Sequence, residues 1–522
     1  MLQRQTQASG YWETFRVTDA DIEYIYNLLL EKETPLSLDE IALAIVEYRA
    51  HQEEEAFRRQ LARGELFQPK NTYQVGQTLV FSALNYAVGT VVNVRPGSNP
   101  EHGDFTVIEV EFENRRRREF ASDLKTPHPL NVNGDNLLDT ANLLSPRALL
   151  DRYGSTIRAQ LLDRLSREED IVNIADRWFP KSLLVEVNVG HLNLAEAVLD
   201  MAGGGPLPTK DILKDVGLPA EVNSRLQIFS LDYALQEDSR FDEVGPAGQV
   251  LWYLRRLEPP EITDIPPRLR YEPISYDRTL LTAEMLVLEE DIDDEHSPLP
   301  DASPDLREAT ISLIYPHRLV GTLPLSAKLR PLFPTAFRAE RVRMILVDGQ
   351  TGEEFPGWVV PKARFVFGLA EYYRKYRIPV GAYIIVSRMD DPARVMITHA
   401  MRRPRTEWVR MAKVEGNRLL FDIQRRSIGA GYDDLMVVSA DDLESIDVLS
   451  SSINRTRKSL VDLLRELVPE LARLNPQGTV HAKTLYSAVN LLRRCPPGPI
   501  FATLIAHHEF EYVGDSYWRL NR

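Results

Sequence analysis

One short pattern occurs twice in this chain and constrains the fold of both regions that carry it. Each copy reads Phe-x-x-Val-Gly, followed a few residues later by Trp-x-Leu, and each comes directly after three helix-like segments. Apolar residues on both sides of a glycine turn are typical of a two-stranded hairpin packed on a core. The copies consist of Phe241, Val244, Gly245, Trp252 and Leu254, and of Phe510, Val513, Gly514, Trp518 and Leu520.

The segments before each hairpin have apolar residues at helical spacing, with glycine or proline near their ends. Three helices closed by a two-stranded hairpin form a winged helix. We therefore expect a central winged-helix domain over residues 143–258 and a C-terminal one over residues 455–522. The predicted helices cover residues 192–202, 209–216 and 223–238 in the central domain, and residues 458–474, 482–494 and 500–507 in the C-terminal domain.

Two capping boxes predict helices near the N-terminus. Thr18 stands three residues before Asp21, and Ser37 stands three residues before Glu40, so each hydroxyl and carboxylate can cap the first turn reciprocally. A third, heavily charged helix is expected over residues 53–63, ending at a glycine. Residues 1–70 are therefore predicted to form a winged-helix-like helical domain.

The hydrophobic period changes from residue 72 onward. Strand-like segments cover residues 75–81, 89–94 and 105–112, and several short strands at this spacing indicate a small barrel. Val75-Gly76, then Gly89-Thr90-Val91, then a charged strand resembles the SH3-like barrels of transcription-associated proteins. Residues 71–130 are expected to form such a barrel.

The central winged-helix region also resembles a particular type of winged helix. Ser239-Arg240-Phe241 followed by Val244-Gly245-Pro246 is similar to the HARE-type winged helix of an RNA polymerase accessory subunit and of chromatin-associated proteins. Gly217-Leu218-Pro219 stands where that type has Gly-Lys/Arg-Thr-Pro. The resemblance implies contact with DNA, with RNA polymerase or with another protein complex.

The average charge of the chain hides two opposite segments. The net charge is −14, which argues against a simple nucleic-acid coat protein. Residues 307–429 nevertheless contain 22 Lys and Arg against 11 Asp and Glu, a net charge of +11. Residues 258–306 contain 3 Lys and Arg against 14 Asp and Glu, a net charge of −11. A basic module therefore follows directly after an acidic segment.

The sequence of the basic module predicts mostly β structure, with several strands, a short helix that contains aromatic residues, and a later strand preceded by a glycine. This order resembles the B3-type DNA-binding pseudobarrel, which some restriction enzymes also use to recognise their targets. Leu323-Pro324 matches the residues after the first strand of that family, Trp358 its middle strand, and Tyr372-Tyr373 its short helix. Gly381 matches a later glycine, although Ala382 replaces the usual aspartate. The resemblance implies that loops at one end of the barrel grip the major groove.

Arginine outnumbers lysine in the basic module, which is expected to span residues 307–447. Arginine forms bidentate hydrogen bonds with phosphates and with guanine edges, so the expected partner is double-stranded DNA. The predicted nucleic-acid-binding residues are Arg318, Lys328, Arg330, Lys362, Arg364, Arg402, Arg403 and Arg405, with Arg410, Arg425 and Arg426 as further candidates.

Two charged segments have more than one interpretation. The acidic residues 259–306 are expected to form a disordered, solvated linker, and the alternative is an autoinhibitory DNA mimic that covers the basic module. The run from Arg115 to Arg118 either grips phosphates or forms a solvated strand end, because Glu113 and Glu119 flank it.

The third helices of two winged-helix units carry little positive charge. Residues 223–238 have one arginine against three acidic residues, and residues 500–507 have no Lys or Arg. Because phosphate contacts need cations, these two units are expected to bind protein or to serve as scaffold.

No motif for catalysis or cofactor binding occurs in the chain. His481, Cys495, His507 and His508 match no common zinc spacing, so we expect no enzyme, cofactor or metal. The single cysteine, the absence of an apolar run of about 18 residues and the polar first residues predict a cytoplasmic protein without a membrane partner.

The sequence therefore predicts an α+β multidomain protein made of winged-helix units, a small SH3-like barrel and a mostly-β pseudobarrel. The first functional hypothesis is a DNA-binding regulator or accessory factor of transcription or other DNA transactions, which binds without catalysis. The alternative is a scaffold subunit of a larger protein complex. A third hypothesis is a divergent restriction-type nuclease, because a likeness at the level of the fold does not by itself establish a function.

Overall fold

The computed structural model combines helices with several separate β-sheets, as the sequence predicts. It describes residues 5–84, 86–99, 103–131, 143–219, 221–336, 339–437, 439–440 and 442–521. The chain forms two compact units. Unit 1 contains residues 1–186 and 219–230, and unit 2 contains residues 187–218 and 231–522.

Unit 1 begins with helices whose caps the sequence predicts. The Thr18–Asp21 capping box starts α2 (Asp19–Lys32), and Ser37 and Glu40 form reciprocal hydrogen bonds at the start of α3 (Leu38–Leu61). A separate helix over residues 53–63 was expected, and this prediction is wrong, because α3 continues without a break. The sequence between the two expected helices contains no glycine or proline, and the exposed pairs Glu54–Arg58 and Glu55–Arg59 support the helix at i,i+4 spacing.

The helical part of unit 1 is completed by a distant segment. α5 (Pro146–Leu165) packs against α3, where Arg158 pairs with Asp39 at 2.7 Å. β7 (Ile171–Ile174) and β8 (Arg177–Pro180) form a hairpin, and β8 also pairs with β1 (Leu36–Ser37), with Leu36 opposite Trp178. Residues 5–61 and residues 145–180 therefore share one helical body, which also includes the short α1 (Ser9–Glu13).

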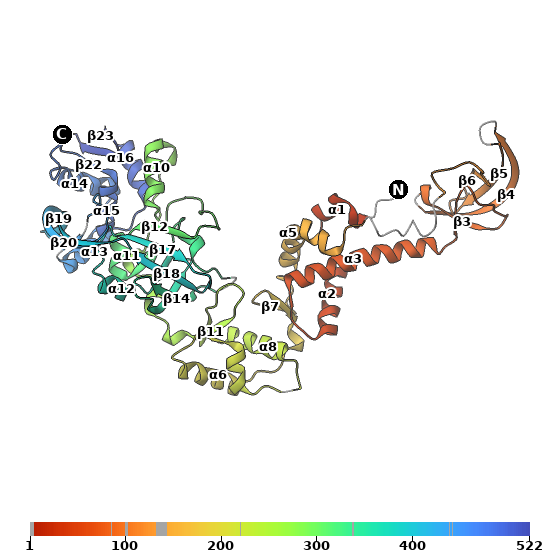
Figure 1. Cartoon of the computed structure of the whole chain (residues 1–522), viewed down its shortest axis with the longest axis horizontal. Coiled ribbons are helices and arrows are strands. Elements are labelled where there is room, and N and C mark those ends of the chain that lie inside the picture. Colours follow the sequence, from red (N-terminus) through yellow and green to blue (C-terminus); the bar gives the residue numbers. More distant parts are fainter. Residues whose placement is uncertain are drawn as a thin grey trace. The chain divides into compact units, whose positions relative to one another are not determined.

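A five-stranded sheet lies between these two halves in the sequence (Figure 1). Its strand order is β2-β3-β4-β5-β6. The core includes Phe67, Phe81, Val91 and Ile108, and a bulge between Val91 and Asn93 interrupts the register of β4 and β5. The strands are β2 (Glu65–Leu66), β3 (Thr78–Phe81), β4 (Ala87–Asn99), β5 (Gly103–Phe112) and β6 (Arg117–Ser122).

The central region has the predicted helices and hairpin. α7 (Thr209–Val216) has the predicted bounds, between α6 (Val189–Met201) and α8 (Ser224–Glu237). The hairpin of β10 (Phe241–Glu243) and β11 (Leu251–Leu254) pairs Glu243 with Trp252, and β11 also pairs with β9 (Leu207–Pro208). The indole of Trp252 is buried and donates a hydrogen bond to Asp232 at 2.8 Å.

Unit 2 also contains a seven-stranded sheet of order β12-β17-β18-β14-β15-β16-β13. Neighbouring strands are antiparallel except for β14 and β18, which are parallel, with Leu346 opposite Val395. Two short helices follow the first and the fifth strand of this sheet along the chain, α11 (Tyr315–Val320) and α12 (Ala370–Lys375). The strands are β12 (Glu308–Ser312), β13 (Thr322–Pro324), β14 (Val342–Asp348), β15 (Glu354–Val360), β16 (Phe365–Phe367), β17 (Tyr383–Arg388) and β18 (Arg394–His399).

A long antiparallel ribbon follows the seven-stranded sheet. It consists of β19 (Met401–Glu415) and β20 (Arg418–Ala430), and β19 also pairs with the short β21 (Ser439–Ala440). One end of the ribbon continues from the seven-stranded sheet, and near its hairpin turn Phe421 is buried among residues of the C-terminal core. The ribbon therefore connects two bodies of unit 2.

The C-terminal region again has the predicted helices and hairpin. α13 (Leu443–Arg455) precedes α14 (Leu460–Ala472), β22 (Val480–His481), α15 (Ala482–Leu492) and α16 (Pro497–Ala506), and the chain ends with β23 (Phe510–Gly514) and β24 (Tyr517–Leu520). The three-stranded sheet has the order β22-β24-β23. The sheets β9-β11-β10 and β1-β8-β7 have the same arrangement, in which the last strand lies between the first and the second.

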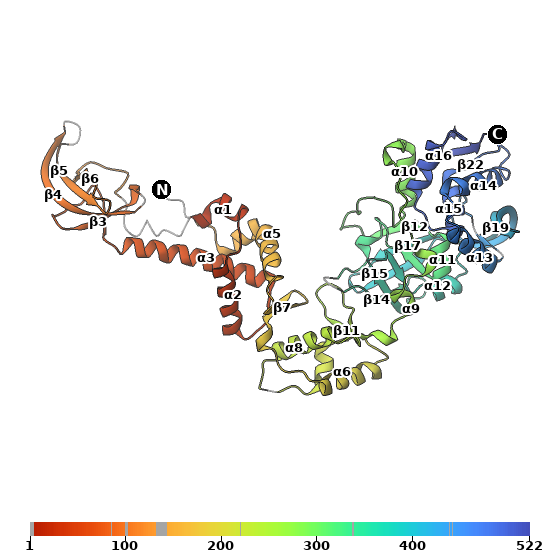
Figure 2. The same ribbon diagram turned by 180° about the vertical axis from the view of Figure 1, so that it is seen from behind.

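The acidic segment is folded, so the expectation of a solvated linker over residues 259–306 is wrong. α9 (Pro260–Thr263) and α10 (Ala283–Ile292) lie within it, and α10 packs beside α16 (Figure 2). Glu289, Asp293, Asp294 and Glu295 are buried. Asp293, Asp294 and Glu295 have partners from remote segments, and Glu289 pairs with Arg278 of the same segment. These partners explain the burial, because unpaired carboxylates would stay in water.

Arg494 is the partner of two of these carboxylates, Asp294 and Glu295. Its buried guanidinium lies 2.7 Å from Asp294 and 2.6 Å from Glu295. Tyr486 donates a hydrogen bond to Asp294 at 2.6 Å, and His317 lies 3.1 Å from Glu295. Burial alone would raise the pKa of Glu295, but the charges of Arg494 and His317 hold it well below its usual range.

Within the described residues, no helix combines the length and the apolar character that a membrane crossing requires.

Candidate nucleic-acid interface

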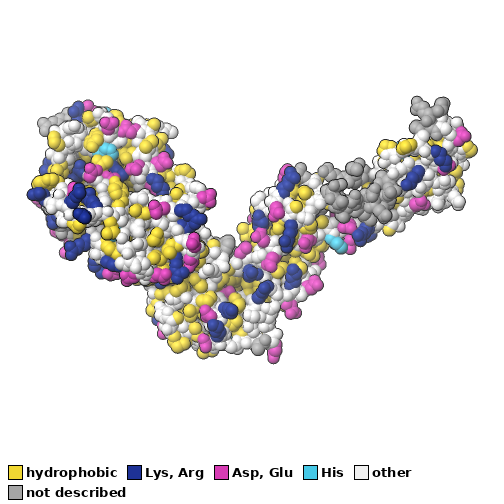
Figure 3. Space-filling view, viewed as in Figure 1, with side chains coloured by type: hydrophobic (Ala, Val, Ile, Leu, Met, Phe, Trp, Pro, Cys, Tyr) yellow, Lys and Arg dark blue, Asp and Glu magenta, His cyan; other side chains and the backbone are white. Residues whose placement is uncertain are grey.

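The middle of the β19–β20 ribbon exposes most of its arginines. Arg403 and Arg405 on β19 and Arg425 and Arg426 on β20 are all exposed. Side chains in an antiparallel pair share a face when they lie opposite each other, and Arg425 lies opposite Trp408 while Arg426 lies opposite Glu407. The arginines of β20 therefore point to both faces of the ribbon. Figure 3 shows dark blue side chains at the edge of unit 2 where Figure 1 places β19 and β20.

A large aromatic side chain stands among these arginines. Trp408 is 68% exposed, and the guanidinium of Arg425 lies 5.3 Å from the centre of its ring. An exposed tryptophan with a stacked arginine is a surface on which a base or a sugar can pack.

Arg402 is held more firmly than its neighbours on the ribbon. Its guanidinium pairs with Glu407 at 3.1 Å and lies 5.0 Å from the centre of the Tyr432 ring. These contacts make Arg402 a structural member of the ribbon base, whereas Arg403 and Arg405 form no ion pair within the part of the chain that the structure describes.

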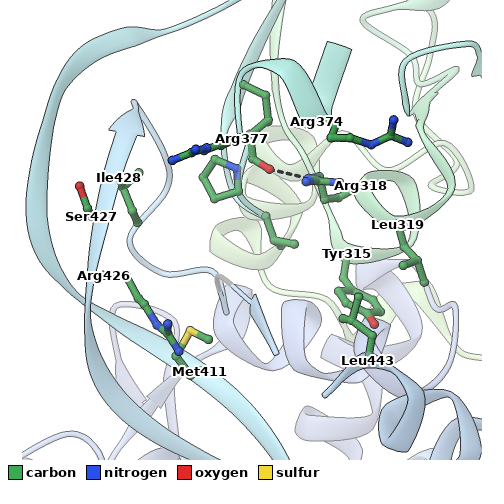
Figure 4. Close-up of a pocket in the computed structure, with 13 residues that line it drawn as sticks. Tyr315, Arg318, Leu319, Arg374, Arg377, Met411, Arg426, Ser427, Ile428 and Leu443 are labelled. Carbon is green, nitrogen blue, oxygen red and sulfur yellow. Dashed lines mark hydrogen bonds between the residues drawn. The ribbon is translucent and has the colours of Figure 1, made fainter. Parts of the chain in front are cut away.

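A pocket of about 570 Å³ lies between the ribbon and the seven-stranded body. Four arginines line it, Arg318, Arg374, Arg377 and Arg426, and none of its described lining residues is Asp or Glu. Figure 4 shows Arg318, Arg374 and Arg377 on one side and Arg426 with Ser427 and Ile428 on the strand opposite. We call this feature the arginine pocket. Its apolar floor includes Leu319, Pro379, Val380, Met411 and Leu443.

Arg318 carries a partly buried charge at this pocket. Its Nε donates a hydrogen bond to the carbonyl of Ile378, and its guanidinium lies 5.7 Å from the centre of the Tyr373 ring. Burial lowers the pKa of Arg318, and the charge of Arg374 lowers it further. Within the described chain, no carboxylate lies in ion-pair contact with Arg318, whereas Arg374 pairs with Glu371 at 2.6 Å.

Tyr315 also lines the arginine pocket. Its side chain is 4% exposed, and its hydroxyl has no hydrogen-bond partner among the described residues. Burial raises the pKa of Tyr315, so the hydroxyl is protonated at neutral pH. The oxygen atom itself is buried, so a ligand in the arginine pocket can contact the ring of Tyr315 but not its hydroxyl.

The helix that carries Arg374 is fixed by hydrogen bonds at its back. Tyr373 donates to the carbonyl of Thr322 at 2.9 Å, and Tyr372 shares a hydrogen bond of 2.8 Å with His399. Lys375 lies 2.9 Å from Asp348. Although burial raises the pKa of Asp348, hydrogen bonds from Lys375 and Tyr376 lower it to about 2.

Three of the predicted binding residues contact the acidic segment. Lys328 donates to the carbonyl of Glu290 at 2.8 Å, and Arg364 donates to the carbonyl of Glu295 at 2.8 Å. Arg330 pairs with Asp301 at 2.7 Å. These side chains hold the acidic segment on the seven-stranded body, whereas Lys362 is exposed.

The structure therefore separates the predicted residues into groups. Arg318 lines the arginine pocket, Arg402, Arg403 and Arg405 lie on the ribbon, and Lys328, Arg330 and Arg364 contact the acidic segment. Sequence reasoning missed Arg374, Arg377 and Tyr315. The close succession of aromatic and basic residues from Tyr372 to Arg377 at a helix end is the signal that could have found the first two.

The arginine run of unit 1 forms a weaker cluster. Arg117 pairs with Glu111 at 2.7 Å, while Arg116 and Arg118 line a pocket of about 510 Å³ that also includes Glu113. Glu113 itself pairs with Arg63. Carboxylates therefore neutralise part of this surface.

Among the described residues, no group of three or more His, Cys, Asp or Glu is arranged to hold a metal ion. Comparison of the chain with protein-family models, with curated proteins and with solved structures finds no match. The geometry of the ribbon and of the arginine pocket is therefore the basis for a functional conclusion.

Proposed function

We propose that this protein binds DNA through the basic surface of unit 2 and acts by binding and positioning, without catalysis. The observation that carries the proposal is the ribbon with exposed Arg403, Arg405 and Arg425, next to a pocket lined by four arginines and no described carboxylate. Exposed arginines near a protein surface attract phosphates, and two-stranded ribbons fit into a groove of duplex DNA.

The topology of unit 2 supports the proposal. The seven-stranded sheet has two short helices after its first and fifth strands, and this element order resembles that of a B3-type pseudobarrel. We propose that it is such a pseudobarrel. In this proposal the DNA surface extends from the barrel onto the ribbon that follows it.

We further propose that the three bodies with equal strand arrangement are winged-helix units. Each has the order helix, strand, helix, helix, strand, strand, and each pairs its first strand with its last. In the N-terminal body, the five-stranded sheet stands between the second and third helices, and we propose that it is an SH3-like barrel. Modules of these kinds suit a cytoplasmic regulator or accessory factor that contacts both DNA and a protein complex such as RNA polymerase.

The ionic strength dependence of DNA binding tests the proposal. Fluorescence anisotropy of the full chain with a labelled 20-base-pair duplex, at several salt concentrations, should give log-log slopes that fall by about 0.9 for each phosphate contact removed. The double variant Arg403→Gln/Arg405→Gln should therefore lower the slope by about 1.8 if each arginine neutralises one phosphate.

A matched control removes the same formal charge elsewhere. Arg465 pairs with Asp462 and Glu509, and Arg519 pairs with Glu511, so carboxylates already neutralise both cations. Arg465→Gln/Arg519→Gln should leave the slope unchanged. Absence of binding at low salt, or equal slopes for the two double variants, would refute the assignment of the ribbon to DNA.

A scaffold role has one observation in its favour. α6 exposes Val189, Leu194 and Met201, with Met201 at 81% exposure. Apolar side chains on one exposed helix fit a protein partner better than DNA. If Leu194→Asp abolishes the assembly of the protein with its cellular partners and ribbon variants change nothing, the scaffold role is favoured.

A further inference from the structure

We propose that the arginine pocket binds one unpaired nucleotide of a DNA strand, with its phosphate against the arginines and its base on the apolar floor. This inference rests on the proposed DNA-binding function and names the form of DNA that the site prefers. An unpaired nucleotide occurs at a strand overhang, in a gap or where a base leaves the duplex.

The charge of the pocket calls for an anion. Arg318 is partly buried, and neither it nor Arg377 forms an ion pair within the described chain. A guanidinium that has lost part of its hydration without gaining a carboxylate is destabilised until an anion approaches it. Arg426 enters from the opposite strand, so a phosphate between the two sides can contact arginines from separate elements.

The floor of the pocket calls for a flat, apolar group as well. Leu319, Ile378 and Ile428 line it together with the buried ring of Tyr315. An inorganic anion alone would leave this surface unused, whereas a nucleobase has two apolar faces and polar edges.

The shape of the pocket separates an unpaired nucleotide from a duplex. A recess of about 570 Å³ has the size of sites that enclose small ligands, which range from roughly 300 to 1,000 Å³. Duplex DNA is a convex rod whose bases are stacked inside, so it cannot fill a recess with an apolar floor. A nucleotide outside the stack can enter such a pocket, as enzymes that flip bases demonstrate.

The test compares two forms of one DNA. Full-length protein is titrated with a blunt 20-base-pair duplex and with the same duplex carrying a six-nucleotide single-stranded overhang, at equal salt. We expect the overhang to increase the affinity about tenfold or more. A ratio near one with clear binding of the blunt duplex overturns the inference and leaves the proposed function intact, whereas no binding of either DNA overturns both.

Three variants locate the effect. Arg377→Gln changes an exposed side chain, and Tyr315→Phe removes only a hydroxyl that has no described partner, so both should fold normally. Arg377→Gln should lower the overhang preference to about twofold or less, whereas Tyr315→Phe keeps the ring that lines the pocket and should leave the preference unchanged. Arg425→Gln lies on the opposite face of the ribbon and should weaken both DNAs while keeping their ratio. An overhang preference that survives Arg377→Gln overturns the assignment to the pocket.

A competing nucleotide distinguishes a strand from a soluble ligand, since both present the same phosphate and base. Deoxythymidine monophosphate should displace the overhang only at millimolar concentration, because the strand gains the ribbon contacts as well. Micromolar binding of the mononucleotide without any overhang preference would identify a soluble nucleotide as the occupant and overturn the inference.

Discussion

Replacing Arg494 by methionine should strongly destabilise unit 2. The guanidinium is fully buried, with 0% of its side chain exposed, and it touches both Asp294 and Glu295. Without it, two carboxylates remain buried. Tyr486 and the backbone N–H of His296 still donate to Asp294, and His317 still contacts Glu295. Removing one partner of a buried ion pair costs about 3–5 kcal/mol, because the remaining charge is left without compensation.

Hydrogen–deuterium exchange of the full-length protein measures this cost locally. The amides of α15, which lies in the C-terminal core, should exchange about 150 to 5,000 times faster in the variant, since about 1.4 kcal/mol corresponds to a factor of ten. Exchange at this helix avoids the assumption that a chain with two compact units unfolds in one step.

Arg465→Met is the matched control. Arg465 also touches two carboxylates, at 2.8 and 2.9 Å, but it is 47% exposed. Water solvates those carboxylates when the arginine is removed, so the loss should stay below about 1 kcal/mol. If Arg494→Met lowers the free energy of unfolding no more than Arg465→Met does, the buried charges do not anchor the acidic segment. The hypothesis that this segment is a displaceable DNA mimic would then be favoured.

Two further substitutions have defined outcomes. Burial raises the pKa of Asp232 to about 7, above its ordinary value of 3.8, so its stabilising contribution is complete below about pH 4 and is lost as the pH rises to 7. The free energy of unfolding should therefore fall by about 4 kcal/mol over this range. Asp232→Asn should flatten this decline in urea unfolding curves recorded from pH 4 to 8. An equally steep decline in the variant would show that another group is responsible. Gly321 has φ +78°, and an added Cβ would lie 2.6 Å from the Cβ of Ala370, so Gly321→Ala should lower the free energy of unfolding by about 1–3 kcal/mol. Gly352 also has a positive φ but open space around it, so Gly352→Ala is the control. If it lowers the free energy of unfolding as much as Gly321→Ala does, the contact with Ala370 contributes nothing.

Local patterns in the sequence determined several elements of this protein. The capping box at Thr18 starts α2, and the apolar spacing from Thr209 to Val216 defines α7 with its predicted bounds. The Phe-x-x-Val-Gly and Trp-x-Leu patterns become β-hairpins at both predicted places. These features depend on residues within one turn or one hairpin, so the neighbouring sequence contains the whole cause.

Only the tertiary structure decided which segments belong together. β1 pairs with β8, so Leu36 meets Trp178, and the strands between them do not enter this sheet. The acidic segment is buried because Arg494, about 200 positions away, compensates Asp294 and Glu295. Local composition predicts a solvated linker there, since it contains the charges but not their partners.

The sequence also predicted only part of the candidate site, and the tertiary structure decided the rest. Composition identified a basic module, and the sequence named Arg318, Arg403 and Arg405 within it. The arginine pocket exists only because the ribbon places Arg426 opposite Arg377 and Arg318, which lie far from it in the sequence. The sequence states which residues are charged. Only the fold decides which cations lie near a carboxylate and which lie beside an apolar floor, because this depends on burial and distance.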